Sequence, residues 1–424
     1  MIIFKFERNF FLLSLINSIM KLIYDTIHGF IHFKNDDLQF LDNRWMKRLK
    51  RIKQLGLLDH VFPSASHSRF EHVLGVYNYS NIYIDYLENN SGEYKKKKNI
   101  KKLFTDKEKR CVALAGLFHD LGHGPFSHIF DNVVLPRFCP NIEGSTHEKR
   151  SQWIVEQIFK EVQPDGFNGY DIDLIKNIIE PPESMINLDS YTGIKTYTGV
   201  EKPYMFEIVN NELNSIDVDK LDYLQRDAKH IGLDYTFDPN RIFNKSFISP
   251  TTNSIVYHKN IESNIFDMYY TRYKFHKDIY NHKTVKLIEL MLGDAFIESN
   301  NVYNFCSLLN TEDYLGLDDS IYSQILFSNI NSLKKSKNLL KKIEDRDLYK
   351  CHYYGEIDEY NLPDVYEQNY NKINISFNLC SGQRDPLYNV LFRDSHQKKT
   401  YYGKLSGRLV PNKFEENIVM YYSK

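Results

Sequence analysis

The sequence predicts a mainly helical fold with a smaller mixed α+β lobe at its C-terminal end. Two observations lead to this prediction. Segments with apolar residues at helical spacing recur between residues 44 and 299. After about residue 350 they are replaced by short Tyr- and Asn-rich runs such as 372–380, whose composition favours strands. We therefore expect an N-terminal extension at 1–20, a helical core at 21–300 and a C-terminal helical and mixed lobe at 301–424.

The elements follow in chain order from periodicity and turn residues. Residues 44–53 predict an amphipathic helix, with Trp45, Leu49 and Ile52 on one face and basic residues around the rest. Apolar periodicity predicts further helices at 70–88, 107–121, 148–162, 171–179, 204–231 and 261–299. Polar and turn-forming residues predict a Lys-rich loop at 89–102, a surface excursion at 180–203 and a hairpin at 245–258.

Composition favours an intracellular protein, cytoplasmic or nuclear, that does not enter a membrane. The apolar run at 10–19 is too short to span a bilayer and lacks the cleavage site of a signal peptide. The net charge of −1 gives no global attraction for nucleic acid or membrane surfaces. The five cysteines are scattered without a CxxC pair, so neither a zinc knuckle nor a disulfide framework is predicted, and a reducing compartment fits.

The stretch 112–128 concentrates groups that bind metals or move protons. An apolar helix ends in His119 and Asp120, His123 lies one turn further on, and His128 follows a Gly- and Pro-containing turn. Three imidazoles and a carboxylate within ten positions are hard to explain by packing, because an unpaired buried carboxylate is costly. The pattern indicates a metal or phosphate site.

Three further segments complete this pattern, at 67–72, 146–149 and 217–227. Together with 112–128 they resemble the HD superfamily of metal-dependent phosphohydrolases, whose ligands run His, then His-Asp, then a distant Asp. Two imidazoles and two carboxylates balance one divalent ion, leave positions open for water and substrate, and suit Fe, Mn or Zn better than Mg. The resemblance implies that the metal ligands are His72, His119, Asp120 and Asp219.

A finer resemblance points to one branch of that superfamily, the SAMHD1-like deoxynucleoside triphosphate triphosphohydrolases. Six segments carry it in the same order: 24–33, 53–56, 61–76, 114–131, 216–227 and 267–283. The resemblance covers roughly residues 21–300 and implies attack at the α-phosphorus of a dNTP, which releases a deoxynucleoside and tripolyphosphate. Because about 20 residues precede it, we expect a catalytic core with no SAM-like domain ahead of it.

The same resemblance places His123, His128 and His147 beside the substrate phosphates. A histidine can donate a proton to a leaving oxygen because its pKa lies near the working pH. His128 is the candidate general acid, and His123 is a phosphate-side partner. Asp131 follows His128 by three positions and is expected to orient it, and Glu148 is expected to orient His147.

Substrate contacts also follow from the resemblance. Phosphate contact is implied for Arg69, Lys220 and Arg272, whose positive charges suit phosphate oxygens. Contact with the sugar and base is implied for Gln54, Leu55, Tyr223, Asp227 and Tyr280. Gln54 would contact the 3′-hydroxyl, and Tyr280 would pack against the deoxyribose and crowd out a 2′-hydroxyl. Asn281 departs from the family, which tends to carry Gln there, and this puts the base-side contacts in doubt.

Members of the family are activated by nucleotides that bridge subunits into a tetramer, and part of that apparatus matches. The matching residues are Lys21, Asp25, Asp42, Arg241, Asn264, His282 and Lys283. The differing residues are Tyr24 in place of Asn, Lys47 and Lys50 in place of Gln and Arg, and Lys245, His258 and Asn260. Lys lacks the bidentate fork of Arg, although the helix with Lys50 could still hold phosphates. We expect a homo-oligomer, a dimer or tetramer, with a changed activator or looser control.

Two alternatives share these motifs. An HD phosphodiesterase acting on another phosphoester would use the same metal ligands, and only the phosphate-binding cations with Tyr223 and Tyr280 favour a nucleoside triphosphate. A nucleotide- or nucleic-acid-binding module without turnover is suggested by the basic segments 44–53 and 95–102. The intact ligand set argues for catalysis, and the near-neutral net charge leaves nucleic acid a secondary partner.

Overall fold

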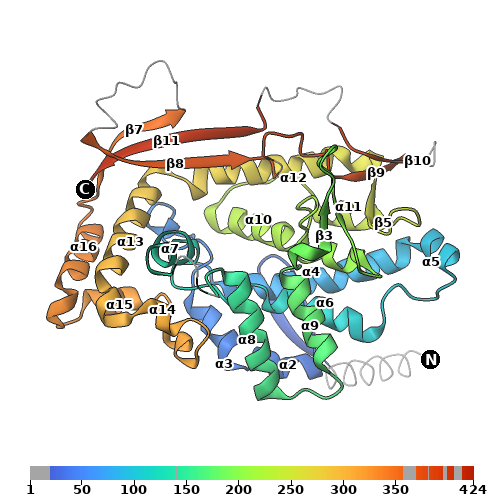
Figure 1. Cartoon of the computed structure of the whole chain (residues 1–424), viewed down its shortest axis with the longest axis horizontal. Coiled ribbons are helices and arrows are strands. Elements are labelled where there is room, and N and C mark those ends of the chain that lie inside the picture. Colours follow the sequence, from blue (N-terminus) through green and yellow to red (C-terminus); the bar gives the residue numbers. More distant parts are fainter. Residues whose placement is uncertain are drawn as a thin grey trace, which may run out of the picture.

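The computed structural model describes residues 20–139, 142, 144–356, 369–380, 382–394, 399–404 and 413–424. Helices form most of this part, and small sheets lie along its margins (Figure 1). The helices are α2 (Asn35–Leu41), α3 (Arg44–Arg48), α4 (Arg69–Asn90), α5 (Gly92–Lys98), α6 (Asp106–Phe118), α7 (Leu135–Phe138), α8 (His147–Val162), α9 (Gly169–Ile179), α10 (Val218–Ile231), α11 (Pro239–Asn244), α12 (Glu262–Phe275), α13 (Lys283–Tyr303), α14 (Phe305–Leu308), α15 (Ile321–Leu326) and α16 (Lys334–Glu344). The mainly helical class is therefore confirmed.

The strands pair mostly as antiparallel neighbours. They are β1 (Met20–Asp25), β2 (Gly29–Lys34), β3 (Ile186–Leu188), β4 (Lys195–Tyr197), β5 (Ser246–Ile248), β6 (Ile255–His258), β7 (Lys350–Glu356), β8 (Asn371–Asn378), β9 (Leu391–Asp394), β10 (Lys399–Tyr402) and β11 (Glu415–Ser423). The sheets run β1-β2, β3-β4, β10-β9-β6-β5 and β7-β11-β8. In Figure 1 the β7-β11-β8 sheet lies along the upper edge, beside α12 and α13.

The three helices that carry the candidate site begin at capped ends. At the start of α6, the Thr105 hydroxyl accepts the Glu108 amide at 3.1 Å and the Glu108 carboxylate accepts the Thr105 amide at 2.7 Å. At the start of α10, the Asp217 carboxylate accepts the Lys220 amide at 2.9 Å. The Ser68 amide donates to Glu71 at 3.3 Å at the start of α4. Because each cap satisfies an amide that the helix leaves free, these starts are fixed. His72 and Asp219 lie close to the starts of α4 and α10, whereas His119 lies at the far end of α6.

Close approach of α4 and α10 depends on one glycine. A Cβ atom on Gly75 would lie 1.9 Å from the Asp222 carboxylate, so any larger residue would push α10 away from α4. The contact brings the polar face of α10 onto the first turns of α4, where His72 lies.

Most of the expected elements are found, with shifted bounds. The helices predicted at 70–88, 107–121, 148–162 and 171–179 are confirmed as α4, α6, α8 and α9, and the hairpin at 245–258 as β5 and β6. The prediction of a continuous loop at 89–102 is wrong, because α5 forms within it and buries Tyr94 against Tyr204. The helix expected at 261–299 is interrupted between α12 and α13, and only residues 218–231 of the segment 204–231 form a long helix.

The amphipathic segment 44–53 differs more. Trp45, Leu49 and Ile52 are buried as predicted, but α3 ends at Arg48 and a single 3₁₀ turn follows. Arg48 does not lie on the basic outer face either. It is fully buried, and its guanidinium donates to the Leu317 carbonyl at 3.1 Å and the Leu121 carbonyl at 3.3 Å. The prediction is wrong at this residue because its acceptors come from distant segments.

One hydrophobic core extends from the N-terminal hairpin to the last strand of the described part. The sheet of β5 and β6 is completed by β9, which pairs in parallel with β6 through Tyr257–Phe392 and His258–Arg393. Strands β9 and β11 are therefore packed on the same core as the helices, whereas Ile375 and Phe377 of β8 form a separate small cluster with Ile418. The domain bounds expected at residues 20 and 300 stay a prediction.

A disulfide joins Cys139 to Cys306, with Cα atoms 5.9 Å apart. The two cysteines are separated by 167 residues, so no local spacing could reveal the pair. The expectation that the scattered cysteines form no disulfide is wrong for this pair. The bond ties the segment after α7 to the start of α14.

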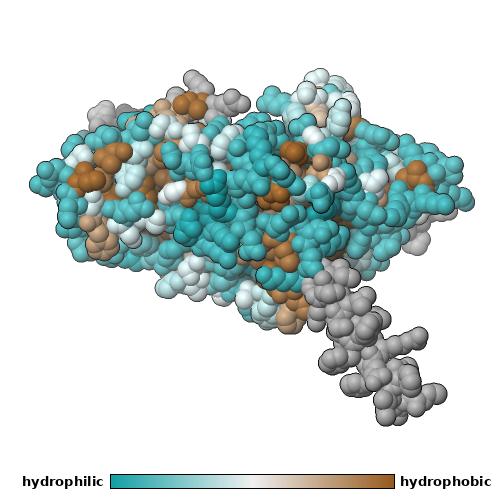
Figure 2. All heavy atoms as spheres, turned by 90° about the horizontal axis from the view of Figure 1, so that it is seen from below, coloured by the Kyte–Doolittle hydropathy of each residue, from teal (hydrophilic) through white to brown (hydrophobic). Residues whose placement is uncertain are grey.

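Among the described residues, no helix combines the length and apolarity that crossing a bilayer requires. In the face shown in Figure 2, hydrophobic side chains form small separate patches among hydrophilic ones. Such scattered exposure is ordinary for a protein surface.

Candidate metal centre and catalytic cavity

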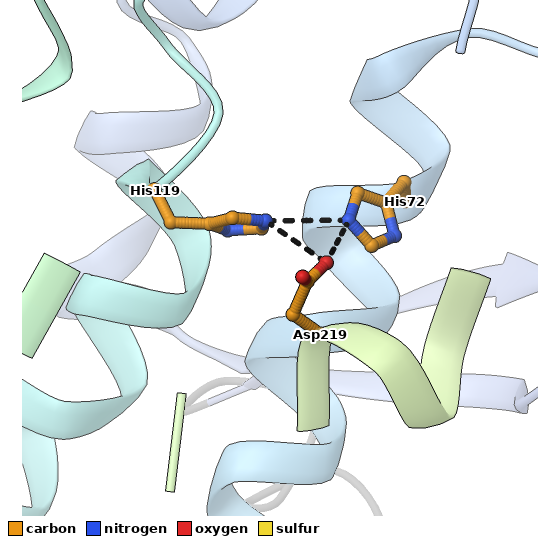
Figure 3. Close-up of side chains that lie close together, drawn as sticks. All are labelled: His72, His119 and Asp219. Atoms are coloured by element: carbon orange, nitrogen blue, oxygen red, sulfur yellow. Dashed lines mark hydrogen bonds and ion pairs between the residues drawn. The ribbon is translucent and has the colours of Figure 1, made fainter. Parts of the chain in front are cut away.

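Three side chains from three helices converge on one point (Figure 3). His72 comes from the first turns of α4, His119 ends α6, and Asp219 lies in the first turn of α10. His72 Nε2 lies 3.3 Å from His119 Nε2 and 3.0 Å from Asp219 Oδ1. His119 Nε2 lies 3.5 Å from the same carboxylate oxygen. The three ligand atoms are thus close enough to share one ion.

The other ring nitrogens show how the two imidazoles are oriented. His72 Nδ1 lies 2.8 Å from an oxygen of Asp222, and His119 Nδ1 lies 2.8 Å from the Gly116 carbonyl. Both partners are acceptors, so each ring carries its proton on Nδ1 and turns the Nε2 lone pair toward the other ring. Two facing lone pairs beside a carboxylate repel each other without a cation between them. This donor set fits a divalent metal ion.

The carboxylates around the cluster draw positive charge to it, which a proton on His72 supplies when no ion is bound and which a metal ion would supply in place of that proton. Burial alone lowers the pKa of His72, but hydrogen bonds to Asp219 and Asp222 outweigh it and raise the pKa to about 10. For His119, burial again lowers the pKa, and the carboxylates of Asp120 and Asp219 outweigh it and raise the pKa. The site therefore favours positive charge at its centre.

Asp120 faces the same centre from the side of the cavity. Its carboxylate oxygens lie 3.5 Å from His119 Nε2 and 3.7 Å from His72 Nε2. The carboxylate also pairs with Arg69 and lies 3.2 Å from His123 Nε2. Burial raises the pKa of Asp120, but the charges of Arg69, His119 and His123 hold it well below the usual range. Asp120 is thus ionised and held beside both imidazoles.

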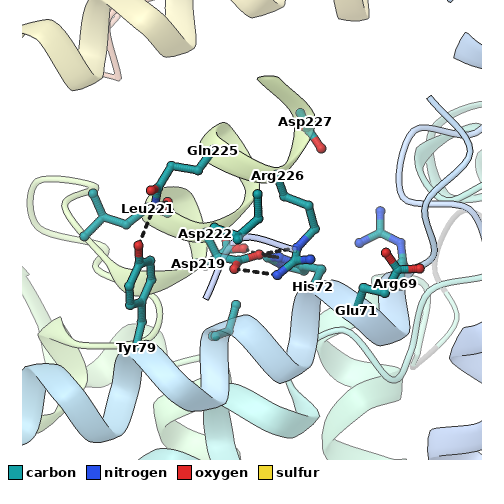
Figure 4. A network of polar contacts seen from close by, with 12 residues as sticks. Arg69, Glu71, His72, Tyr79, Asp219, Leu221, Asp222, Gln225, Arg226 and Asp227 are labelled. Atoms are coloured by element: carbon teal, nitrogen blue, oxygen red, sulfur yellow. Dashed lines mark hydrogen bonds and ion pairs between the residues drawn. The ribbon is translucent and has the colours of Figure 1, made fainter. Parts of the chain in front are cut away.

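A buried polar network supports His72 from behind (Figure 4). Asp222 accepts from His72 at 2.8 Å, from Arg226 Nε at 2.9 Å and from His28 Nε2 at 2.6 Å. Arg226 in turn donates to Asp25 at 2.8 Å, in the hairpin that opens the described chain. Arg226 Nη2 donates a fourth hydrogen bond to Asp222 at 3.0 Å, so each carboxylate oxygen accepts two, which fixes the position of His72.

The converging cluster opens onto a cavity of about 630 Å³, a size that is typical of small-molecule sites. Most of the residues expected at the substrate line it. These are Gln54, Leu55, Arg69, Asp120, His123, His128, His147, Asp219, Lys220, Tyr223, Asp227, Arg272 and Tyr280. His72, His119 and Asp131 do not line it and act from behind its wall.

His123, His128 and His147 lie together on one wall of the cavity. The rings of His123 and His147 stack with their centroids 3.8 Å apart, and the His128 ring stands edge-on to His123 with the two centroids 5.2 Å apart. Asp131 pairs with Arg150 and lies 3.4 Å from His147 and 3.6 Å from His123. No hydrogen bond joins Asp131 to His128 in the described part of the chain, so the expectation that Asp131 orients His128 is wrong. Asp131 supports the other two rings.

Two features fix the members of this wall. A Cβ atom on Gly122 would lie 2.0 Å from the His147 carbonyl, so this glycine lets the start of α8 bring His147 against the turn after α6. Glu148 lies 3.2 Å from His147 Nε2, as expected for an orienting partner. The His128 ring is exposed to the cavity. The protein atoms around the ring nevertheless keep water away from it, and this desolvation, together with the positive charges of Arg69 and His147, lowers the pKa of His128 to about 4.

The expected phosphate-binding cations are already held in place. Arg69 donates to the Ser127 hydroxyl at 2.8 Å, and Lys220 Nζ lies 2.8 Å from Asp217. Arg272 reaches the Asn378 carbonyl at 3.4 Å, whereas its Nε atom is buried and has no hydrogen-bond partner. A buried donor without a partner is costly, so an anion beside Arg272 would satisfy it.

The sugar end of the expected site is also rigid. The Tyr280 hydroxyl donates to Asp227 at 2.6 Å, and the other Asp227 oxygen lies 2.8 Å from His67 Nε2. Asp227 lines the cavity, but both of its carboxylate oxygens are hydrogen-bonded to these neighbours. Its role is therefore to position Tyr280. Gln54 offers a buried side-chain oxygen that has no partner.

Some cavity residues escaped the sequence reasoning. His276 lies one helical turn from both Arg272 and Tyr280 and lines the same cavity, so helical spacing could have found it. Ser376 comes from β8, and nothing local to β8 indicates that this strand closes the cavity. Further lining residues are Asn132, Asn210, Lys286 and Glu289.

The residues expected to bind an activating nucleotide are spread over several elements. Asp25 is buried and paired with Arg226, and Asn264 is buried with hydrogen bonds to Asp238, so neither side chain is free for a nucleotide. Asp42 is exposed and lies 3.6 Å from Lys47. The other members are exposed or half-buried, namely Lys21, Lys50, Arg241, His282 and Lys283.

His282 and Lys283 line a second, open cavity of about 350 Å³. Lys277 and His352 are among its other lining residues. Its wall therefore carries several cationic or titratable groups, whereas Tyr353 and Tyr354 contribute aromatic surface.

The helical fold and its buried His/Asp cluster define an HD-domain protein, and the family model described as HD domain matches residues 69–227. Relatives extend this beyond the domain. The Bos taurus protein named deoxynucleoside triphosphate triphosphohydrolase SAMHD1 is 36% identical over 360 residues, covering 80% of this chain and 59% of the relative. Its Homo sapiens counterpart is 34% identical over 363 residues, covering 80% and 55%. The chain thus spans less than two thirds of either protein.

A relative from Dictyostelium discoideum, named as a SAMHD1 homolog with the same activity, is covered more fully. It is 31% identical over 428 residues, which are 95% of this chain and 77% of the relative. The chain belongs to the HD-domain family of SAMHD1-type deoxynucleoside triphosphate triphosphohydrolases. The family resemblance expected from its motifs is confirmed.

Proposed function

We propose that this protein is a metal-dependent phosphohydrolase that cleaves a dNTP into a deoxynucleoside and inorganic tripolyphosphate. One observation carries the proposal: three features meet around one cavity. They are the His/Asp cluster, the three cations Arg69, Lys220 and Arg272, and the tyrosines Tyr223 and Tyr280. A nucleoside triphosphate has matching parts, since a polyanionic chain is joined to a sugar and a base. The names of the relatives support the same reaction.

The metal would be held by His72, His119, Asp120 and Asp219. Two imidazoles and two carboxylates suit Fe, Mn or Zn better than Mg, because Mg prefers oxygen ligands alone. When bound, the ion would supply Lewis-acid polarisation of a phosphoryl oxygen and a water activated for attack. Asp222 and the Gly116 carbonyl keep both imidazoles in the tautomer that can coordinate it.

The reaction adds water to the α-phosphorus and breaks its bond to the 5′-oxygen, which needs a proton as it leaves. We assign that proton to His128. With a pKa of about 4, this ring is neutral at neutral pH before substrate arrives. The negative triphosphate would raise the pKa, because a nearby opposite charge favours the protonated form. Proton transfer would thus depend on substrate being present. His123 and His147 would face the phosphates from the same wall.

The cations and Tyr280 would fix the two ends of the substrate. Arg69, Lys220 and Arg272 would hold the phosphates. The Arg272 Nε–H group, which has no hydrogen-bond partner in the protein, would donate to a phosphate oxygen. Tyr280, held by Asp227, would pack against the deoxyribose and leave no room for a 2′-hydroxyl. An intracellular location, cytoplasmic or nuclear, follows from this substrate.

Product analysis tests the proposal. The protein is incubated with one dNTP and a divalent metal, and the products are separated by anion exchange, with Asp219→Ala as the metal-site control. We expect deoxynucleoside and tripolyphosphate in equal amounts from the wild type and neither from the variant. A dNMP with pyrophosphate would mean a different bond is cleaved. The absence of products with every candidate metal would favour a binding module without turnover.

We also propose that the protein forms a homo-oligomer whose activity responds to nucleotides with little base selectivity. Lys47 and Lys50 are exposed, so the segment that carries them can attract phosphates, but neither offers the planar fork that reads a base edge. Initial rates of dTTP hydrolysis with GTP, with ATP and without activator test this, and sedimentation reports assembly. A strict requirement for GTP would contradict it.

A further inference from the structure

The turn that delivers His128 has a strained backbone. Phe126 and Ser127 are consecutive, neither is glycine, and both have left-handed φ angles, of 56° and 57°. This conformation is unfavourable for a residue with a side chain and persists only where the surroundings hold it. His128 follows directly and opens the helical segment that continues into α7. Some contact outside the turn must therefore fix the position of this histidine.

The carboxylate of Asp319 supplies that contact. Its Oδ1 accepts the Phe126 amide at 2.7 Å, within the strained turn. Its Oδ2 accepts the Lys53 amide at 2.8 Å, in the loop that continues into Gln54 and Leu55. One carboxylate thus bridges two cavity walls: the loop 53–56, which we call the sugar-side loop, and the turn 124–128, which we call the acid-side turn.

The two segments are also joined directly. The Ser127 hydroxyl donates to the Lys53 carbonyl at 2.9 Å and accepts from Arg69 at 2.8 Å. A Cβ atom on Gly56 would lie 3.2 Å from the Phe126 carbonyl, so the two backbones are already in contact. The sugar-side loop and the acid-side turn are therefore linked through Asp319 and through Ser127.

Asp319 lies far from both segments in the chain and outside residues 69–227, which match the HD domain. It follows Asp318, whose carboxylate instead binds the side chain of Arg51 and the Ser320 amide. The Asp319 amide itself donates to the Arg51 carbonyl at 3.2 Å, which fixes the residue against the start of the sugar-side loop. The two neighbouring carboxylates thus have different tasks.

We propose that Asp319 is a positioning residue that sets the proton donor His128 against the sugar-binding side of the cavity. Gln54 and His128 would contact opposite ends of the scissile region, so the clamp would fix the distance between them. This inference rests on the proposed function for the role of His128, whereas the clamp itself rests on the hydrogen bonds alone. The two amides that Asp319 accepts, those of Phe126 and Lys53, are not part of the metal site, and neither is Asp319 itself.

Asp319→Asn tests the proposal with little change in size. An amide keeps one acceptor oxygen but presents an N–H group to the second backbone amide, so one side of the clamp is lost. Asp318→Asn is the matched control. Hydrogen exchange measured by mass spectrometry should be faster in 53–56 and 124–129 for Asp319→Asn and unchanged there for Asp318→Asn. Unchanged exchange in both variants would overturn the clamp.

Kinetics distinguish positioning from general support. A displacement of about 1 Å can cost on the order of 10²-fold in rate, so kcat of Asp319→Asn should fall between about 10-fold and 100-fold. In a His128→Ala background the same substitution should change kcat by less than about twofold, because the group it positions is gone. Equal losses in both backgrounds would show that Asp319 does not act through His128.

A second variant keeps the test open if Asp319→Asn does not fold. Asp319→Glu keeps the charge but lengthens the side chain by one methylene group, so it cannot accept both amides in the present geometry, and its effect on kcat should likewise vanish in the His128→Ala background. If the wild type forms no tripolyphosphate, the proposed function falls. Hydrogen exchange then decides whether Asp319 clamps the two segments, and a negative result there overturns the inference independently.

Discussion

Replacing Glu207 by Gln should stabilise the protein at neutral pH. Glu207 is fully buried, and its Oε2 accepts the Ile255 amide at 3.0 Å. Among the described residues no cation pairs with it, and its Oε1 has no hydrogen-bond partner. Burial outweighs the hydrogen bonds from Ile255 and Ser254 and raises the pKa of Glu207 from 4.5 to about 8. Glutamine has nearly the shape of the protonated acid and cannot ionise.

The magnitude follows from the difference in pKa. Because the folded pKa of Glu207 lies above the unfolded value, its contribution to stability is complete below about pH 4.5 and is lost as pH rises toward 8. One pKa unit corresponds to about 1.4 kcal/mol. Wild type should therefore be less stable than Glu207→Gln by about 3 kcal/mol at pH 7, by about 5 kcal/mol above pH 8, and hardly at all at pH 4.5.

Urea unfolding of both proteins between pH 5 and 9 measures this difference directly. Many other groups titrate in this range, so the informative quantity is the gap between the two curves at each pH. We expect the gap to widen steadily up to about pH 8 and then to level off. Parallel curves would refute the reasoning, since they would mean that Glu207 titrates alike in the folded and unfolded chains.

Three further predictions concern the site. Asp222→Asn removes a carboxylate that holds His72, so metal affinity in a chelator competition should fall by about 10–100-fold; unchanged affinity would contradict the supporting role. His128→Ala should lower kcat by roughly 10² to 10⁴ with the metal content unchanged, whereas a loss of metal would move His128 into the ligand set. Tyr280→Ala should narrow the gap between dGTP and GTP hydrolysis, with Tyr280→Phe as the size-matched control, and a wild type that hydrolyses both equally would exclude steric selection.

The metal cluster is the part of the site that the sequence indicates best. His119 and Asp120 are adjacent, and their chemistry leaves few structural explanations, so the motif is visible without the fold. The structure brings His72 and Asp219 to the same point from other helices. Asp222 could also have been noticed, since it lies three residues after Asp219 and so shares a helical face with it.

What escaped prediction depends on partners that are distant in the chain. Arg48 fits an exposed basic face by periodicity, yet its buried acceptors include the Leu317 carbonyl. Asp131 is three positions from His128, but Arg150 and two other histidines hold its carboxylate elsewhere. Local spacing fixes which residues share a helix face. It does not determine which of several nearby polar groups forms a given hydrogen bond or ion pair, because tertiary packing decides that.

The parallel pairing of β9 with β6 has a consequence for how the chain is made. β6 is synthesised roughly 130 residues before β9, which at about 5–20 residues per second leaves one edge of the β5-β6 hairpin open for roughly 7–26 s on the ribosome. An open strand edge invites pairing with other chains. The nascent protein thus passes through a window in which the free edge of β6 can pair with a strand of another chain, and the demand for chaperones should be greatest there. Stop codons before residue 391 would make that window permanent.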